Sequence, residues 1–385
     1  MASPTLAEQR RSTDKVVAYL AAALSMPAER VGKSFRVATP GDIPKILELR
    51  RETLGDVLGS DDEKYWHWKY LEQPGIADGE IPCWVFEKGA EIIGAMGFER
   101  VRLNVKGKVH HAVWSYDIMV RPDYDGRGLG VLMNLVFQER FPLLVVLGTN
   151  ERSTGMLERL FTRLPSLRCW KKVITTRPFF KRRLGSPVLV TALSTVCDPL
   201  LAASAWWRRQ EVPREIEFRA LDRFDQRVDL LCDRVSRRGK VLVQRSQDYL
   251  NWRFGRDPRW KYDCYGAFTG NQLRGYIVTR MIRQNGSKSG LIVDWLCDDQ
   301  AHSRSISMTR VLMQFALERL TSKGANAAHV LSCDGASEGA LRDLDFSRDP
   351  AEDVPFFVGA SPKELEHHVL ADDNWFLTRG DSDIG

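Results

Sequence analysis

The chain has 385 residues, of which 43% are hydrophobic and 28% are charged, and its formal net charge is +6. This composition is that of a soluble globular protein, the length predicts two domains, and the mild positive charge favours an anionic partner. Seven cysteines without any Cys-x-x-Cys pair indicate reduced thiols rather than a disulfide framework or a zinc site, so we expect no metal. The N-terminus lacks the layout of a secretory signal and no apolar run reaches about 18 residues, so we expect a cytoplasmic protein without a transmembrane helix.

Residues 1–33 predict a polar lead with a short helix over 16–24. Residues 34–178 then predict one α/β unit in the order strand, helix, antiparallel strands, helix, strand, helix. Thr39 or Asp42 is expected to cap the first of these helices, because their side-chain oxygens can accept the free amides of its first turn. The elements expected in this unit are 35–38, 43–54, 83–87, 91–99, 109–120, 130–141, 143–147 and 153–164.

Residues 179–212 interrupt this pattern, and residues 213–385 then repeat the order of the first unit. Each unit is expected to have an α/β (α+β) fold, with a mixed, mostly antiparallel central sheet flanked by helices. The elements expected in the second unit are 216–220, 222–232, 262–269, 272–283, 290–297, 308–321, 327–333 and 337–344.

The repeat is also visible in individual residues. The pattern Tyr-x-x-Trp-basic-aromatic occurs over 65–70 and again over 249–254, each time with a proline four residues further on. Gly94 and Asp117 in the first unit have counterparts in Gly275 and Asp294 in the second. Three matches at a nearly constant offset favour the duplication of one fold over chance similarity of composition.

A glycine-rich segment follows the strand expected over 109–120 and leads directly into a helix. It reads Asp125-Gly126-Arg127-Gly128-Leu129-Gly130. Glycines let the backbone turn tightly and approach a ligand, and the free amides of the following helix point back at the turn. The segment therefore predicts an anion cradle suited to a pyrophosphate. The antiparallel strands that precede it argue against a dinucleotide-binding βαβ unit.

Residues 34–178 resemble the GNAT acyltransferase superfamily. The resemblance rests on Val120-x-Pro122, on Asp125-x-x-Gly128-x-Gly130, and on Asn150 soon after the next strand. It implies two tandem GNAT-like domains and an N-acyltransferase that uses acyl-CoA, with direct attack of an amine on the thioester. It also implies that the amides of Arg127 to Gly130 hold the CoA pyrophosphate, while Asn150 contacts the pantetheine arm or the reaction centre.

The resemblance further implies a backbone amide near Met119 or Val120 that stabilises the oxyanion. Two positions depart from the family pattern. Asp125 stands where the family has Arg or Gln, so its carboxylate is expected to point away or to be compensated by Arg127. Met156 and Leu157 lie where the family often has a tyrosine acid, so no general acid is assigned. A thiol with a pKa of about 8.5 can leave with help from water.

Proton removal from the attacking amine needs a base, because an alkyl ammonium has a pKa of about 10. Asp117 is the first candidate because it lies on the strand that feeds the loop, near where the family places a base. Glu99, at the end of the preceding strand, is the second candidate, and His111 is the third. For each of them the alternative is an ordinary polar residue of a strand, without a catalytic role.

The second unit has no glycine in the equivalent loop, which begins with Asp298-Asp299. Two adjacent carboxylates would repel a pyrophosphate, so this unit is interpreted as a degenerate partner that shapes the acceptor cleft. If both units are inactive, the protein is a non-catalytic GNAT-fold binding or scaffold protein in envelope glycan or lipid synthesis. Binding of nucleic acid is not expected, because the positive charge is spread along the chain and interleaved with acids.

The segment 179–212 has basic flanks, an apolar centre and terminal tryptophans. This pattern is typical of a helix in a membrane interface, and a core helix that bridges the two domains is the alternative. Peripheral contact through 179–210 would place the protein at the inner face of a membrane. The acceptor is then expected to be a small-molecule or lipid amine, such as an amino sugar or a sphingoid base. The acyl length and the oligomeric state are not predicted.

Overall fold

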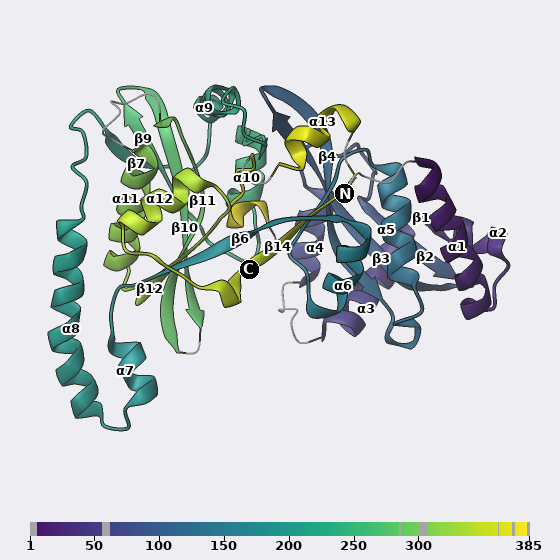
Figure 1. Ribbon diagram of the computed structural model, residues 1–385, viewed down its shortest axis with the longest axis horizontal. Coiled ribbons are helices and arrows are strands. Elements are labelled where there is room, and N and C mark those ends of the chain that lie inside the picture. The colour runs from purple at the N-terminus through teal and green to yellow at the C-terminus, as the bar shows by residue number, and fades with distance from the viewer. Residues whose placement is uncertain are drawn as a thin grey trace.

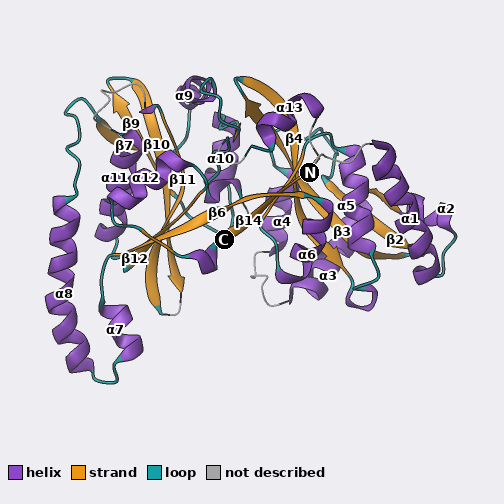
Figure 2. Ribbon diagram, viewed as in Figure 1, coloured by secondary structure: helices purple, strands orange, loops and turns teal. Residues whose placement is uncertain are grey.

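The computed structural model describes residues 6–55, 62–284, 286–299, 307–360, 362–371 and 374–382. Within these residues the strands form one continuous 14-stranded sheet, and helices cover it in both halves of the molecule (Figure 1; Figure 2). The sheet order is β1-β2-β3-β4-β5-β14-β6-β12-β11-β10-β9-β7, with β13 paired to β6 and β8 paired to β3. A mixed, mostly antiparallel sheet flanked by helices was predicted for each unit, and the structure confirms it.

The first half of the chain supplies the elements on one side of the molecule. Its strands are β1 (Phe35–Val37), β2 (Cys83–Lys88), β3 (Glu91–Val105), β4 (Lys108–Val120), β5 (Leu144–Leu147) and β6 (Thr162–Val173). Its helices are α1 (Leu6–Leu24), α2 (Ala28–Ser34), α3 (Ile43–Leu54), α4 (Asp62–Leu71), α5 (Leu129–Arg140) and α6 (Glu151–Leu160).

The second half begins after the helical segment formed by α7 (Arg177–Arg183) and α8 (Pro187–Trp207). Its strands are β7 (Glu217–Ala220), β8 (Leu242–Val243), β9 (Asp263–Thr269), β10 (Gln272–Gln284), β11 (Ser287–Cys297), β12 (Ala327–Ser332), β13 (Ser347–Arg348) and β14 (Val354–Ala360). Its helices are α9 (Gln226–Ser236), α10 (Gln247–Gly255), α11 (Met308–Ser322), α12 (Gly335–Asp343) and α13 (Lys363–Val369).

Most element boundaries follow the local sequence. The predicted helix 43–54 matches α3, and Thr39 and Asp42 form a capping box over the short 3-10 helix that precedes it. The helix predicted over 153–164 ends at Leu160, because the chain continues as β6 from Thr162. The lead helix is longer than the predicted 16–24 and packs against α5.

Two strands are shared between the halves. β14 comes from the second half, yet it lies between β5 and β6, with Phe356 opposite Leu147 on one side and opposite Leu164 on the other. β6 continues beyond this point and pairs antiparallel with β12, with Trp170 opposite Val330. The boundaries predicted at 178 and 213 therefore divide the sequence, whereas the sheet crosses them.

A pseudo-two-fold arrangement relates the halves where α4 meets α10. Trp68 and Trp252, the tryptophans of the repeated pattern, stack with ring centroids 4.9 Å apart. The indole N–H of each donates to the backbone carbonyl of the other at 3.1 Å. The strand registers agree as well, since Gly94 lies opposite Val120 and Gly275 lies opposite Cys297. These reciprocal contacts support the duplication inferred from the sequence.

Candidate functional site

The glycine-rich segment forms a tight turn that ends at the start of α5. Gly126 and Gly128 have φ angles of 71° and 85°, in the left-handed region that favours glycine, and Gly128 is the N-cap of α5. A Cβ at Gly128 would also lie 3.4 Å from the ring of Tyr19 in α1. The first-turn amides of α5 have no intrahelical acceptors, so they point at the turn with the positive end of the helix dipole. The backbone thus has the geometry of an anion cradle.

The charged residues of this turn have partners of their own. The carboxylate of Asp125 accepts a hydrogen bond from the amide of Gly126 at 2.9 Å and lies 3.4 Å from the guanidinium of Arg152. Arg127 lies over the ring of Tyr124, 5.4 Å from its centroid. The sequence-based expectation left two options for Asp125, and the contact with Arg152 favours the one in which an arginine neutralises it, although that arginine is not Arg127.

The sheet splits next to this turn. β4 and β5 pair in parallel over just two positions, Val113 opposite Leu144 and Trp114 opposite Val145. Beyond Trp114, β4 continues to Val120 along β3, while β5 pairs with β14 on its other side. The two parallel strands therefore diverge, and the open end of the split faces the glycine-rich turn.

Backbone direction distinguishes the two residues named for the oxyanion. The amide of Arg121 donates to the carbonyl of Ile93 in β3 at 2.9 Å. Because backbone groups alternate sides along a strand, the amide of Met119 also faces β3. The amide of Val120 faces the opposite side, into the split, so Val120 is the better placed donor.

Asp117 lies at a bulge in β4 and has a φ angle of 48°. Its carboxylate accepts hydrogen bonds of 2.6 Å from Arg50 of α3 and from the hydroxyl of Tyr70 of α4. The ammonium of Lys69 lies 3.6 Å away. Burial alone would raise the pKa of Asp117, but the charges of Lys69 and Arg50 and these hydrogen bonds outweigh it and hold the pKa well below its ordinary value of 3.8. Such a carboxylate is a weak proton acceptor, and it ties α3 and α4 to the bulge.

Arg50, Lys69 and Tyr70 were not predicted as site residues. Arg50 also contacts Asp62 at 2.8 Å, which fixes its guanidinium between two carboxylates. Burial, reinforced by the charge of Asp117, raises the pKa of Tyr70 well above 10 and keeps its hydroxyl protonated as a donor. Lys69 and Tyr70 belong to the repeated pattern over 65–70, which is a signal in the sequence that could have found them.

Glu99 lies opposite Trp114, at the point where the split begins. Its side chain is 2% exposed, and its carboxylate is 3.7 Å from the guanidinium of Arg253 in α10 of the second half. Burial, followed by the charge of Glu99, raises the pKa of the nearby Tyr249 well above 10. Glu99 is therefore a buried acid at the junction of the two halves, close to the apex of the split.

The remaining predicted residues have simpler positions. His111 is exposed and lies opposite Arg102, six residues from Asp117 along β4, which corresponds to roughly 20 Å of strand. The structure does not bring His111 to the split. Asn150 follows β5 and caps α6, where its side-chain oxygen accepts the amide of Ser153 at 2.9 Å. This position is at the mouth of the split, and the capping contact alone accounts for the residue.

The equivalent split in the second half is closed by the chain itself. β11 and β12 pair in parallel from Ser289 to Ile292, and beyond them the segment 375–382 enters between the strands. Thr378 bridges Ser332 at the end of β12, and its hydroxyl donates to Asp294 of β11 at 2.7 Å. In the second half the chain itself therefore lies between the two diverging strands.

The two acids that replace the glycines in the second half also have structural contacts. The carboxylate of Asp298 pairs with Arg234 at 3.3 Å and with Arg238. Asp299 caps α11, where it accepts the amide of Thr309 at 3.0 Å and its hydroxyl at 2.7 Å. The rest of this loop, residues 300–306, lies outside the described residues. Where the first half has an anion cradle, the second half thus has acidic side chains that pair with neighbouring residues.

Comparison with known proteins identifies the fold of this arrangement. Residues 34–139, which hold β1 to β4, the glycine-rich turn and α5, match the sequence family described as "Acetyltransferase (GNAT) domain". This segment is a GNAT domain. Among curated proteins no sequence matches the chain.

Solved structures resemble the chain over most of its length. A GCN5-related N-acetyltransferase from Anabaena variabilis has a TM-score of 0.58 at 12% identity, covering 84% of this chain and 71% of that chain. The N-myristoyltransferase of Saccharomyces cerevisiae, crystallised with myristoyl-CoA and inhibitors, has a TM-score of 0.54 at 13% identity, with coverages of 86% and 81%. A protein of Enterococcus faecalis described as a probable N-acyltransferase has a TM-score of 0.55 at 11% identity, with coverages of 85% and 72%. At these identities the likeness shows the shared fold.

The GNAT domain fits an acyl-CoA in its backbone. Gly128 has a φ of 85°, a backbone conformation in which any other residue would be strained. The amides from Arg127 to Gly130 would hold the pyrophosphate, and the split beside Val120 would receive the thioester arm. Within the described residues, no group of three or more His, Cys, Asp or Glu side chains could hold a metal ion.

Proposed function

We propose that the protein is an acyl-CoA-dependent N-acyltransferase and that its GNAT domain carries the reaction. The observation that supports this most directly is the contrast between the two splits. The first opens toward a glycine-rich turn and the start of a helix, while the second is filled by 375–382 and has acids in place of glycines. A chain that had lost the activity in both halves would have no reason to keep one cradle intact.

The reaction joins an amine nitrogen to the acyl carbon as the C–S bond of the thioester breaks. The ammonium form of the amine must first lose a proton. We propose Glu99 as the proton acceptor, because it is buried at the apex of the split, while Asp117 is held in its ionised form by three partners. The amide of Val120 is the proposed donor to the oxyanion, since it faces the split.

We also propose that α8 rests on a membrane surface, which favours a lipid amine over a soluble amino sugar as acceptor. α8 spans 21 residues, and an 18-residue stretch within it has a mean hydropathy of 1.6, the composition of a membrane span, with 11% of that stretch buried. It cannot cross a membrane, because β6 before it and β7 after it belong to one sheet. A helix that is apolar, exposed and unable to span can lie in the interface.

The acyltransferase proposal is tested with purified protein and a panel of acyl-CoAs from acetyl to palmitoyl, with thiol release followed in the presence and absence of amines. In Gly128→Glu, a carboxylate in the cradle and the strain of a positive φ should abolish acyl-CoA binding, with at least a hundredfold loss of turnover. Gly155→Glu, the same substitution on the exposed face of α6 with nothing within 4 Å, is the matched control and should retain activity.

Glu99→Gln separates binding from chemistry in the same assay. If Glu99 accepts the proton, this variant binds acyl-CoA as the wild type does but turns over amines at least tenfold more slowly at neutral pH. Acyl-CoA binding without thiol release, in the wild type and with every amine, would contradict the proposal and favour the scaffold function.

A further inference from the structure

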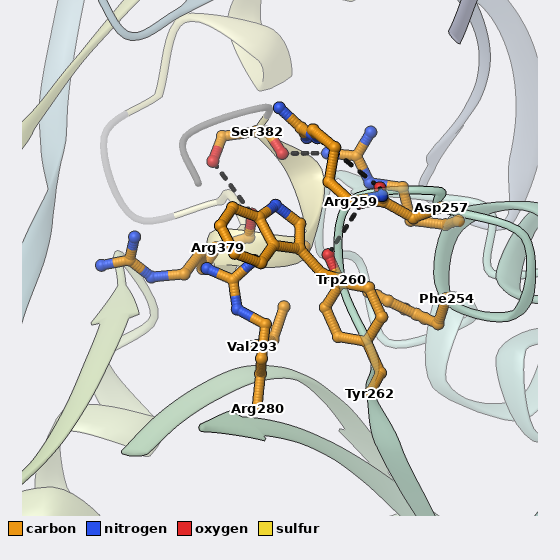
Figure 3. Close-up of a pocket in the computed structure, with 11 residues that line it drawn as sticks. Phe254, Asp257, Arg259, Trp260, Tyr262, Arg280, Val293, Arg379 and Ser382 are labelled. Atoms are coloured by element: carbon orange, nitrogen blue, oxygen red, sulfur yellow. Dashed lines mark hydrogen bonds and ion pairs between the residues drawn. The ribbon is translucent and has the colours of Figure 1, made fainter. Parts of the chain in front are cut away.

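A hollow of about 320 Å³, which is largely open solvent around a water-accessible space of about 20 Å³, lies in the second half beside its junction with the first, outside the split described above. Figure 3 shows it between the loop that follows α10, strand β10 and the C-terminal segment. Four arginines line it together with a single acid, Asp257, and three aromatic rings. The arginines are Arg253, Arg259, Arg280 and Arg379, and the rings are those of Phe254, Trp260 and Tyr262.

Arg280 is the residue that makes this pocket unusual. It is 3% exposed, and its guanidinium lies against the ring of Trp260, 4.2 Å from the centroid (Figure 3). Its Nε is buried without a hydrogen-bond partner, and no ion pair joins Arg280 to any residue within the described parts of the chain. Burial lowers the pKa of Arg280, and the nearby Tyr262 and Asp257 offset this only in part. A buried guanidinium without a direct ion pair is costly, so the site is suited to an anion.

The neighbouring charges do not neutralise Arg280. The carboxylate of Asp257 already accepts the amide of Arg259 at 2.9 Å and the hydroxyl of Tyr262 at 3.1 Å. The guanidinium of Arg259 lies 3.4 Å from the ring centroid of Tyr65, which belongs to α4 of the first half. Arg379 contributes a second buried Nε without a hydrogen-bond partner. The pocket therefore keeps a net positive charge.

The strand register relates this pocket to the proposed reaction site. Glu99 lies opposite Trp114 in the first half, and Arg280 lies opposite Leu291 at the corresponding position in the second. Equivalent positions thus hold a buried acidic residue, Glu99, in the first half and a buried basic residue, Arg280, in the second. Arg253, which lines the pocket, lies 3.7 Å from Glu99, so one side chain connects the two places.

We propose that this pocket binds an anionic group, a phosphate or a carboxylate, on the amine acceptor of the reaction. That the anion belongs to the amine acceptor rests on the proposed function, whereas the anion site itself does not depend on it. Arg280 and Arg259 bind the oxygens of the anion, and Trp260 and Tyr262 form the walls. The amine of the same molecule then extends past Arg253 toward Glu99.

The first test measures anion binding without acyl-CoA. Inorganic phosphate and citrate are titrated separately, at constant ionic strength set with chloride, and followed by thermal shift and calorimetry. The wild type should show a saturable rise in Tm, and Arg280→Gln should weaken the affinity at least tenfold. Arg283→Gln, an exposed arginine on the same strand, is the control and should bind as the wild type does. Phosphate binding without citrate binding assigns a phosphoryl group, and the reverse assigns a carboxylate.

A second readout separates a binding role from a structural one. Because Arg280 has no ion pair to lose, Arg280→Gln without added anion should keep or raise the Tm of the wild type. A large fall in Tm would mean that Arg280 supports the fold, and equal anion effects in the wild type and the variant would mean a general salt effect. Either result overturns the proposal.

The last comparison separates this inference from the proposed function. Gly128→Glu should lose acyl-CoA binding yet bind the anion normally. If acyl transfer occurs but amines that carry a phosphate or a carboxylate are no better substrates than neutral amines, in the wild type and in Arg280→Gln alike, the anion site is not an acceptor site. The acyltransferase function would then stand without it.

Discussion

Asp117 has structural contacts that its position in the sequence does not reveal. Its place in the repeat and on the strand before the glycine-rich turn marked it as the first candidate base. In the structure its carboxylate contacts Arg50, Lys69 and Tyr70. These contacts hold two helices to a bulge in β4. Its counterpart Asp294 is held in the same manner by Arg245.

Asp117→Asn is therefore expected to lower stability more than it lowers the chemical step. Loss of one partner from a buried ion cluster costs about 3–5 kcal/mol, which should appear as a fall of several degrees in Tm at pH 7. The folded pKa of Asp117 lies below its unfolded value, so its stabilisation is present above about pH 4 and is lost as the pH falls through the folded pKa. The gap in Tm between wild type and variant should narrow below pH 4, and a gap that widens there would contradict this role.

The cluster could not be derived from sequence because its members are far apart. Arg50 is 67 residues from Asp117, and nothing in the local pattern of α3 distinguishes Arg50 from its exposed neighbour Arg51. The glycine-rich turn was predictable, since its backbone requirements fall within six consecutive residues. Arg280 was missed for the opposite reason, because its burial depends on a loop and a C-terminal segment that meet it only in the folded chain.

At the level of elements, the exposure of α8 rules out one interpretation of residues 179–212. A core helix bridging the two domains was the alternative for 179–212, and it is wrong, because in α8, whose residues are all described, Val190 and Ser194 alone are buried. Apolar composition does not distinguish a helix covered by protein from one covered by another apolar surface. In Figure 1, α8 stands along the outer edge of the second half, with α7 at one end.

Membrane contact through α8 is tested by flotation with vesicles of neutral and anionic lipids. The face to be buried carries Val188, Val196, Leu200, Trp206 and Trp207, which are 64–79% exposed. Val196→Glu with Leu200→Glu should abolish flotation without changing Tm, because neither side chain supports the core. Leu230→Glu, at a residue 58% exposed on α9, is the control and should float as the wild type does.

Basic residues at the end of α7 add a charge dependence to this contact. Lys181, Arg182 and Arg183 are exposed, so binding should be stronger to anionic vesicles and should weaken with salt. Equal binding to both lipid compositions would mean that the apolar face of α8 alone accounts for membrane binding. Absence of binding to either would remove the argument for a lipid amine as acceptor.

For the whole molecule, the order of the elements was predictable and their pairing across halves was not. The apolar runs located β2, β4, β10 and β11 to within three residues of their observed bounds, because each strand carries its own pattern. β3 continues to Val105, six residues beyond its predicted end at 99. The position of β14 between β5 and β6 depends on non-local pairing, which no local pattern encodes.

Shared strands predict that the halves do not fold separately. A fragment of residues 1–178 lacks β14 and would expose one edge of β5, whose four residues are all buried in the intact chain. We expect this fragment to aggregate when expressed alone and to become soluble when residues 213–385 are produced with it. A soluble, monomeric fragment 1–178 that binds acyl-CoA would contradict this prediction and restore two independent domains.

The place of β14 has a consequence for how the protein is made. A ribosome completes β5 roughly 200 residues before it begins β14, which corresponds to on the order of 10 seconds or more at the usual speed of translation. During that interval the nascent chain has a glycine-rich cradle next to an unfinished sheet. If the protein has the proposed function, use of a thioester must wait until β14 has been made, and a product truncated before β14 would be inactive and in need of a chaperone.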